Sequence, residues 1–93
     1  MIHFNMDKVP WDLIPKHMIY GLQLYVEDGV RPGGFMQLVL SGDMEAAKHH
    51  ADPQNAKCLD KYPEILKHLP EDCYGSPEDM EAWIESKGLR GRR

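Results

Sequence analysis

The sequence has no apolar run approaching the ~20 residues that a helix needs to span a bilayer. It has only two cysteines in 93 residues, Cys58 and Cys73, which is too few for a disulfide scaffold. We expect both to be free thiols in a reducing cytoplasm. Residues 1–13 lack a basic segment followed by an apolar one, so no secretory signal peptide is expected. These absences favour a cytoplasmic protein with one small core.

Positive charge is also in short supply, with 11 Lys and Arg against 15 Asp and Glu and a net charge of -4. Broad binding of a phosphate backbone needs a basic face, which this balance does not favour. The charge is unevenly placed, because residues 71–85 carry six carboxylates and no Lys or Arg. Four basic residues follow this stretch within the last seven positions of the sequence: Lys87, Arg90, Arg92 and Arg93. We interpret residues 89–93 as a basic, flexible and solvated tail.

Prolines, glycines and capping residues divide the rest of the chain into short helices. Ile14-Pro15 begins the first helix, and Gly29 ends it in a position that suits a left-handed residue. A second helix, apolar nearly all round, begins at about Gly33, and Asp43 is the expected N-cap of a third helix over residues 44–51.

The second half of the chain repeats this pattern. Asp52-Pro53 opens a longer helical segment, in which Pro63 predicts a kink or a division into two short helices. Ser76-Pro77 begins the last helix and Gly88 stops it. The sequence therefore predicts an all-α, compact single domain of four to six short helices, with a helical core over residues 14–88. Residues 1–13 are expected to form an N-terminal arm, either a short strand or an extended segment that lays Phe4 and Trp11 on the core.

The glycine pair after Pro32 is similar to the start of some phosphate-binding loops. Such a loop needs a Lys and a hydroxyl residue at fixed positions behind the glycines, or a G-x-G-x-x-G motif after a strand. Gly33 and Gly34 have neither, so we interpret them as a tight turn between two helices.

No motif supplies a catalytic nucleophile, base and orienting group together, so we expect no enzyme activity and no cofactor. A pairing of Cys73 with His68 stays open but has no supporting motif. The spacing of the potential metal ligands matches neither a zinc knuckle nor an H-E-x-x-H helix, so no metal site is expected; these ligands are Cys58, Cys73, His49, His50 and His68. A module stabilised by a metal ion bound to Cys58, Cys73 and histidines is kept as a third hypothesis, after the two described below.

Two surface features favour protein binding. The last helix carries Glu78, Glu81 and Glu85 on a polar face, which we predict as a partner-binding surface together with Trp83, provided that this side chain is partly exposed. Six methionines in so small a chain could form an adaptable contact patch, and the candidates for exposure are Met1, Met6, Met36, Met44 and Met80.

The order of motifs from Ile14 to Gly88 resembles a family of small, mostly uncharacterised accessory proteins of tailed bacteriophages and prophages. The most specific parts of the resemblance are Ile14-Pro15, Tyr25-Val26-Glu27, Gly29, Pro32-Gly33-Gly34-Phe35, Val39-Leu40-Ser41, Asp43, Ala51-Asp52, Asn55, Gly75-Ser76-Pro77-Glu78 and Trp83-Ile84. The chain departs from that pattern at Tyr62-Pro63, where the family continues an apolar helix. The resemblance implies no catalytic residues.

The resemblance implies that the chain binds a bacterial host protein or a host defence complex and modulates or inhibits it. The alternative hypothesis is a small nucleic-acid-associated protein that uses Arg90, Arg92 and Arg93. The sequence leaves the identity of the partner and the formation of a homodimer open.

Overall fold

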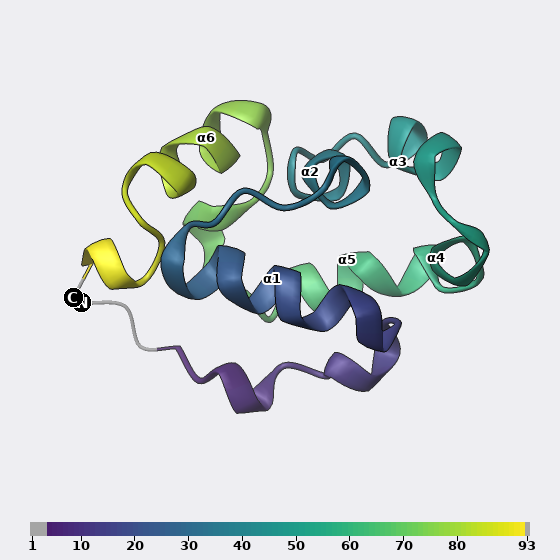
Figure 1. Cartoon of the computed structure of the whole chain (residues 1–93), viewed down its shortest axis with the longest axis horizontal. Coiled ribbons are helices and arrows are strands. Elements are labelled where there is room, and N and C mark those ends of the chain that lie inside the picture. Colours follow the sequence, from purple (N-terminus) through teal and green to yellow (C-terminus); the bar gives the residue numbers. More distant parts are fainter. Residues whose placement is uncertain (1–3, 93) are drawn as a thin grey trace.

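The computed structural model describes residues 4–92. Over this range the regular secondary structure consists of α-helices and 3-10 helices, without a strand (Figure 1). The six α-helices are α1 (Lys16–Asp28), α2 (Gly34–Leu40), α3 (Met44–His50), α4 (Pro53–Lys57), α5 (Tyr62–Leu66) and α6 (Pro77–Glu85). Short 3-10 turns precede, connect and follow them: η1 (Met6–Lys8) and η2 (Trp11–Leu13) before α1, η3 (Leu59–Lys61) between α4 and α5, η4 (Glu71–Cys73) between α5 and α6, and η5 (Arg90–Arg92) after α6. The predicted all-α domain of four to six helices is confirmed.

Three side chains cap helices as the sequence predicts. A carboxylate oxygen of Asp43 accepts a hydrogen bond from the amide of Ala46 at 3.0 Å, and one of Asp52 accepts from the amide of Asn55 at 2.7 Å. The hydroxyl of Ser76 accepts from the amide of Asp79 at 3.0 Å. Each bond satisfies an amide that has no partner within its own helix, which explains why α3, α4 and α6 begin where they do.

The helical segment around Pro63 is divided in two, as the sequence predicts, but the break precedes the proline. Helix α4 ends at Lys57, and Cys58 leaves the helical conformation with a φ of -120°. Helix α5 then begins at Tyr62, so Pro63 lies in its first turn. A proline is well tolerated there because its missing N–H would have no partner in the helix.

Helix α1 runs through the middle of the molecule, with α2 and α6 on one side and the N-terminal segment on the other (Figure 1). Helix α2 packs against both α3 and α6. Four fully buried side chains of the core, Tyr25, Val39, Tyr62 and Trp83, come from four different helices. Burial of such aromatic side chains contributes much of the core stability of so small a domain.

The N-terminal segment is an arm without a strand over its described residues. It forms the two 3-10 turns η1 and η2, and Val9 between them is buried. Phe4 and Trp11 pack against the core as predicted, and the indole N–H of Trp11 donates to the carbonyl of Met6 at 2.8 Å. The first three residues of the predicted arm lie outside the described range.

Candidate partner-binding surface

Helix α6 has one buried face and one charged face. Met80 and Trp83 face the core, while Glu78, Glu81 and Glu85 are exposed on the opposite face. The spacing of three and four residues between the glutamates places them along one side of the helix. The sequence therefore predicts the acidic face correctly, since the apolar residues of the same helix occupy the other positions.

Trp83 does not meet the condition of partial exposure on which its predicted role as a contact residue depends. Its relative exposure is 0 %. The indole N–H donates to the carbonyl of Tyr25 at 2.9 Å, and the guanidinium of Arg92 lies over the ring, 4.0 Å from its centre. The side chain thus joins α6 to α1 and the end of the chain, and it is not available to a partner.

The acidic face continues beyond α6. The 3-10 turn η4 packs against α6 and adds Glu71 and Asp72, which are exposed. We call the exposed carboxylates of these two elements the acidic end; its members are Glu71, Asp72, Glu78, Asp79, Glu81 and Glu85. Six negative charges on adjoining elements repel one another and attract a cationic surface.

One cation lies within ion-pair distance of the acidic end among the described residues. The guanidinium of Arg31 donates two hydrogen bonds to Glu81, each at 2.6 Å, in a side-by-side arrangement. These hydrogen bonds, together with the positive charge of Arg31, hold the pKa of Glu81 below its usual value. Both side chains are about half exposed, so the pair contributes little to stability. Glu78 and Glu85 have no ion pair with any other residue in the range 4–92.

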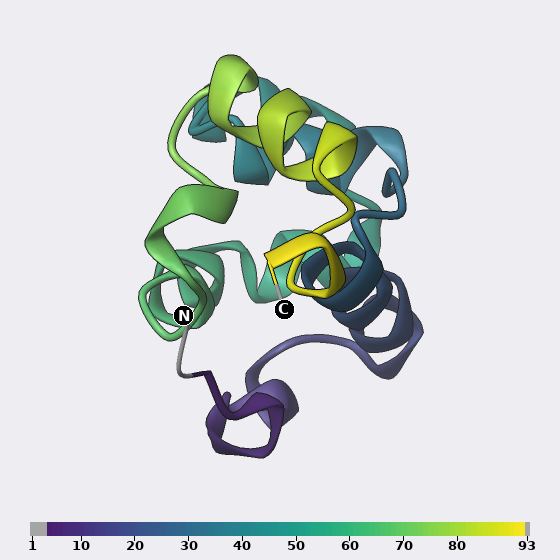
Figure 2. The same ribbon diagram turned by 90° about the vertical axis from the view of Figure 1, so that its left-hand side faces the viewer.

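The end of the chain is docked on the molecule, so the prediction of a flexible tail is wrong for residues 89–92. Leu89 is buried, and its amide donates to the carbonyl of Val26 at 3.0 Å. Arg92 donates to the carbonyl of Gly88 at 3.1 Å besides covering Trp83. Figure 2 shows η5 beside α1 and below α6. Arg90 is exposed and lies 3.8 Å from a carboxylate oxygen of Asp28, whereas Arg93 lies outside the described residues.

The thiols and imidazoles of the described residues do not form a cluster that could bind a metal ion. Within residues 4–92, no three His, Cys, Asp or Glu side chains are placed to hold one metal ion. Cys73 is buried, and burial raises the pKa of its thiol to about 12. A thiol with so high a pKa stays protonated at neutral pH, which makes it a poor nucleophile.

The described methionines that were candidates for an exposed contact patch are buried or partly buried. Met36 and Met80 are buried in the core, with relative exposures of 2 % and 4 %. Met6 and Met44 are partly buried against it, and Met1 lies outside the described residues. These thioethers fill space in an irregular small core.

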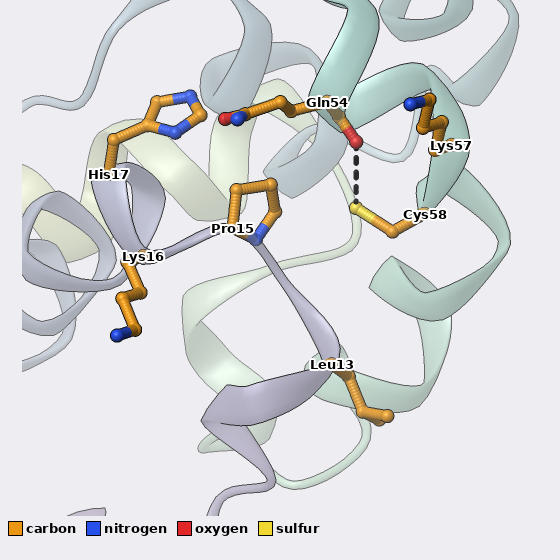
Figure 3. A pocket seen from close by; sticks show the side chains of 7 residues that line it. All are labelled: Leu13, Pro15, Lys16, His17, Gln54, Lys57 and Cys58. Atoms are coloured by element: carbon orange, nitrogen blue, oxygen red, sulfur yellow. Dashed lines mark hydrogen bonds between the residues drawn. The ribbon is translucent and has the colours of Figure 1, made fainter.

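The described part of the chain also forms surface grooves that the sequence does not predict, and two of them are well defined. One, of about 590 Å³, lies between the start of α1 and α4; it is lined by Leu13, Pro15, Lys16, His17, Gln54, Lys57 and Cys58 (Figure 3). The other, of about 400 Å³, lies between η1 and α1; it is lined by Met6, Asp7, Tyr20, Gln23, Leu24, Glu27 and Asp28. Each groove joins residues from separate elements, so no local sequence pattern marks it.

Comparison with models of protein families, with curated proteins and with solved structures finds no match to this chain. None of the helices in the described part of the chain combines the length and apolarity that a bilayer span requires.

Proposed function

We propose that this chain is a non-catalytic accessory protein of the tailed-phage type, and that it binds a bacterial host protein or defence complex and modulates it. The acidic end makes the contact in this proposal. The sequence resemblance supports the phage context, and the charge distribution on α6 and η4 supports the mode of binding.

The observation that carries the proposal is an excess of exposed negative charge on a well-anchored helix. Helix α6 is capped by Ser76 and fixed to the core through Trp83, so its glutamates are held on a defined surface. Of the six carboxylates, only that of Glu81 has an ion pair among the described residues. Such a surface accelerates association with a basic partner and discriminates against acidic ones.

The nucleic-acid alternative has less support. Arg92 is held against Trp83 and the carbonyl of Gly88, so its guanidinium already has partners within the chain. Arg90 lies near Asp28, which partly offsets its charge. A phosphate-binding surface needs several cations that are free to face the nucleic acid.

Affinity purification tests the proposed function. The tagged protein is incubated with bacterial lysate at moderate salt, and co-eluting proteins are identified by mass spectrometry. We expect one host protein in near-equal amount, and its loss when Glu78, Glu81 and Glu85 are all changed to Lys. A salt-sensitive nucleic acid as the sole co-eluting species would contradict the proposal.

A matched control distinguishes an effect of the acidic end from an effect of the net charge of the protein. The triple variant Asp12→Lys, Glu45→Lys and Asp60→Lys makes the same charge change at exposed positions outside α6 and η4. Retention of the partner by this control, with its loss from the α6 variant, supports the acidic end as the contact surface. Equal loss from both variants contradicts it.

A further inference from the structure

The groove between the start of α1 and α4 is basic in a protein that is acidic overall. Its lining includes Lys16 and Lys57 and no carboxylate. Neither ammonium group has a carboxylate within ion-pair distance among the described residues, although the whole chain has a net charge of -4. Two lysines with no ion pair among the described residues therefore line a hollow of about 590 Å³.

The floor of this groove is apolar. Leu13 and the ring of Pro15 belong to the lining, and the side chains of Lys16 and Lys57 lie on opposite sides of Pro15 (Figure 3). The thiol of Cys58 donates to the carbonyl of Gln54 at 3.4 Å. Burial, reinforced by the charges of Asp60 and Asp52, raises the pKa of Cys58, so the thiol adds no negative charge to the floor.

One end of the groove is held by a contact between its two walls. An imidazole nitrogen of His17 lies 3.0 Å from a carboxylate oxygen of Asp52, which also caps α4. This contact fixes the first turn of α1 against the beginning of α4. The carboxylate of Asp52 is thereby engaged with its own neighbours, and it does not neutralise either lysine.

From this arrangement we infer that the groove binds an acidic peptide segment of a partner protein, with an apolar side chain on Leu13 and Pro15 and flanking carboxylates on Lys16 and Lys57. Charge complementarity selects carboxylates, and the apolar floor selects the side chain between them. This surface is separate from the acidic end and takes a partner of the opposite charge, so it does not depend on the proposed function.

The two cysteines provide a reporter for occupancy of the groove. Cys58 is half-buried in its floor, whereas Cys73 is fully buried with a strongly raised pKa. In the folded protein, uncharged iodoacetamide should therefore alkylate Cys58 much faster than Cys73. A segment bound in the groove should slow the alkylation of Cys58.

The test uses the full chain and a fluorescein-labelled peptide, Gly-Asp-Glu-Leu-Glu-Asp-Gly, with binding measured by fluorescence anisotropy. The two control peptides replace every acid by its amide or replace Leu by Ser. We expect the acidic peptide to bind at least about tenfold more tightly than either control, because both the charges and the apolar side chain contribute. At saturation it should slow alkylation of Cys58 about threefold or more.

Charge reversal of the two lysines then locates the site. Lys16→Glu with Lys57→Glu should weaken peptide binding about tenfold or more, whereas Lys8→Glu with Lys48→Glu makes the same net charge change away from the groove and should alter it less than about twofold. The inference is overturned by equal weakening in both double variants, by binding that leaves the alkylation rate of Cys58 unchanged, or by no binding at about 1 mM peptide. Self-association that only the groove variant abolishes, without peptide binding, would assign the groove to a second copy of the chain and also overturn it.

Discussion

Gly29 and Gly88 lie back to back where α1 and α6 end. Both have left-handed backbones, with φ values of 70° and 64°. A Cβ atom added to Gly88 would lie 2.7 Å from the backbone nitrogen of Gly29, and one added to Gly29 would lie 2.8 Å from that of Gly88. The two helix ends are therefore joined through bare backbone, and this junction sets the position of α6 relative to α1.

Replacing Gly88 by Ala should destabilise the protein by about 2–4 kcal/mol, because the left-handed conformation costs an alanine about 1–2 kcal/mol and the added methyl group clashes with backbone. Urea denaturation measures the loss. Gly21→Ala is the control, because its Cβ would meet no atom within 4 Å on the exposed side of α1, and it should gain up to about 1 kcal/mol. A Gly88→Ala variant as stable as the wild type would contradict the close approach of the two helix ends.

A buried hydrogen-bond chain links the same two helices to η4. The hydroxyl of Tyr25 donates to the carbonyl of Cys73, and the carbonyl of Tyr25 accepts from Trp83. Changing Tyr25 to Phe leaves the carbonyl of Cys73 without this partner, so we expect a loss of about 1–3 kcal/mol in urea denaturation. The control Tyr20→Phe alters a side chain that is 70 % exposed and should change stability by less than about 0.5 kcal/mol. Equal effects of the two changes would exclude a stabilising role for the buried bond.

The helix boundaries could be predicted from sequence because local chemistry decides them. Asp43, Asp52 and Ser76 cap their helices through bonds to amides three residues ahead, which any reader of the sequence can count. The acidic face of α6 follows in the same way from helical spacing. The position of the break before α5 is predicted less well. A residue before a proline disfavours the helical conformation, yet Tyr62 adopts it as the first residue of α5.

The burial of Trp83, the docking of Arg92 and the basic groove could not be predicted, because each depends on contacts between distant parts of the chain. The indole of Trp83 is hydrogen-bonded to the carbonyl of Tyr25, 58 positions away in the sequence. The sequence around Arg92 predicts a solvated tail residue, because nothing in it indicates the contact with the ring of Trp83. Local spacing contains no information on such long-range packing, even where it predicts a helix correctly.

The contact between Arg92 and Trp83 should contribute to stability. We expect Arg92→Ala to lower the free energy of unfolding by about 1–2 kcal/mol, because it removes a cation–π contact and a hydrogen bond to the carbonyl of Gly88. Tryptophan fluorescence should change as well, since the ring of Trp83 loses its cover. The control Arg90→Ala removes the same charge from an exposed side chain and should have little effect on either measurement. If the two variants unfold alike and fluoresce alike, the tail does not dock as described.

Deletion of the chain after Gly88 should therefore be more damaging than loss of a solvated tail. It removes Leu89, which is buried, together with the contacts of Arg92. The double variant Arg90→Ala and Arg92→Ala keeps Leu89, and its stability can be compared with that of the deletion in urea. We expect the deletion to be less stable by about 1–3 kcal/mol, the contribution of one buried leucine. Equal stability would show that Leu89 adds nothing to the core.

The protein should lose stability as the pH rises above about 9, because three buried groups keep their protons longer in the folded state than in the unfolded chain. Burial raises the pKa of Cys73 to about 12, and it raises the pKa values of Tyr25 and Tyr62 well above their usual range. Between the unfolded and folded pKa values the unfolded chain binds fewer protons, so each group lowers the free energy of unfolding by about 1.4 kcal/mol per pH unit.

The dependence should have two stages, because an unfolded cysteine titrates near pH 8.5 and an unfolded tyrosine near pH 10, both as order-of-magnitude values. Urea denaturation under reducing conditions at about pH 8, 9.5 and 10.5 samples these stages. We expect Cys73→Ala to flatten the first stage, and Tyr25→Phe with Tyr62→Phe to flatten the second while leaving the first in place. An alkaline slope that is the same in the wild type and in the double tyrosine variant would mean that these phenols are not protected from ionisation by the fold.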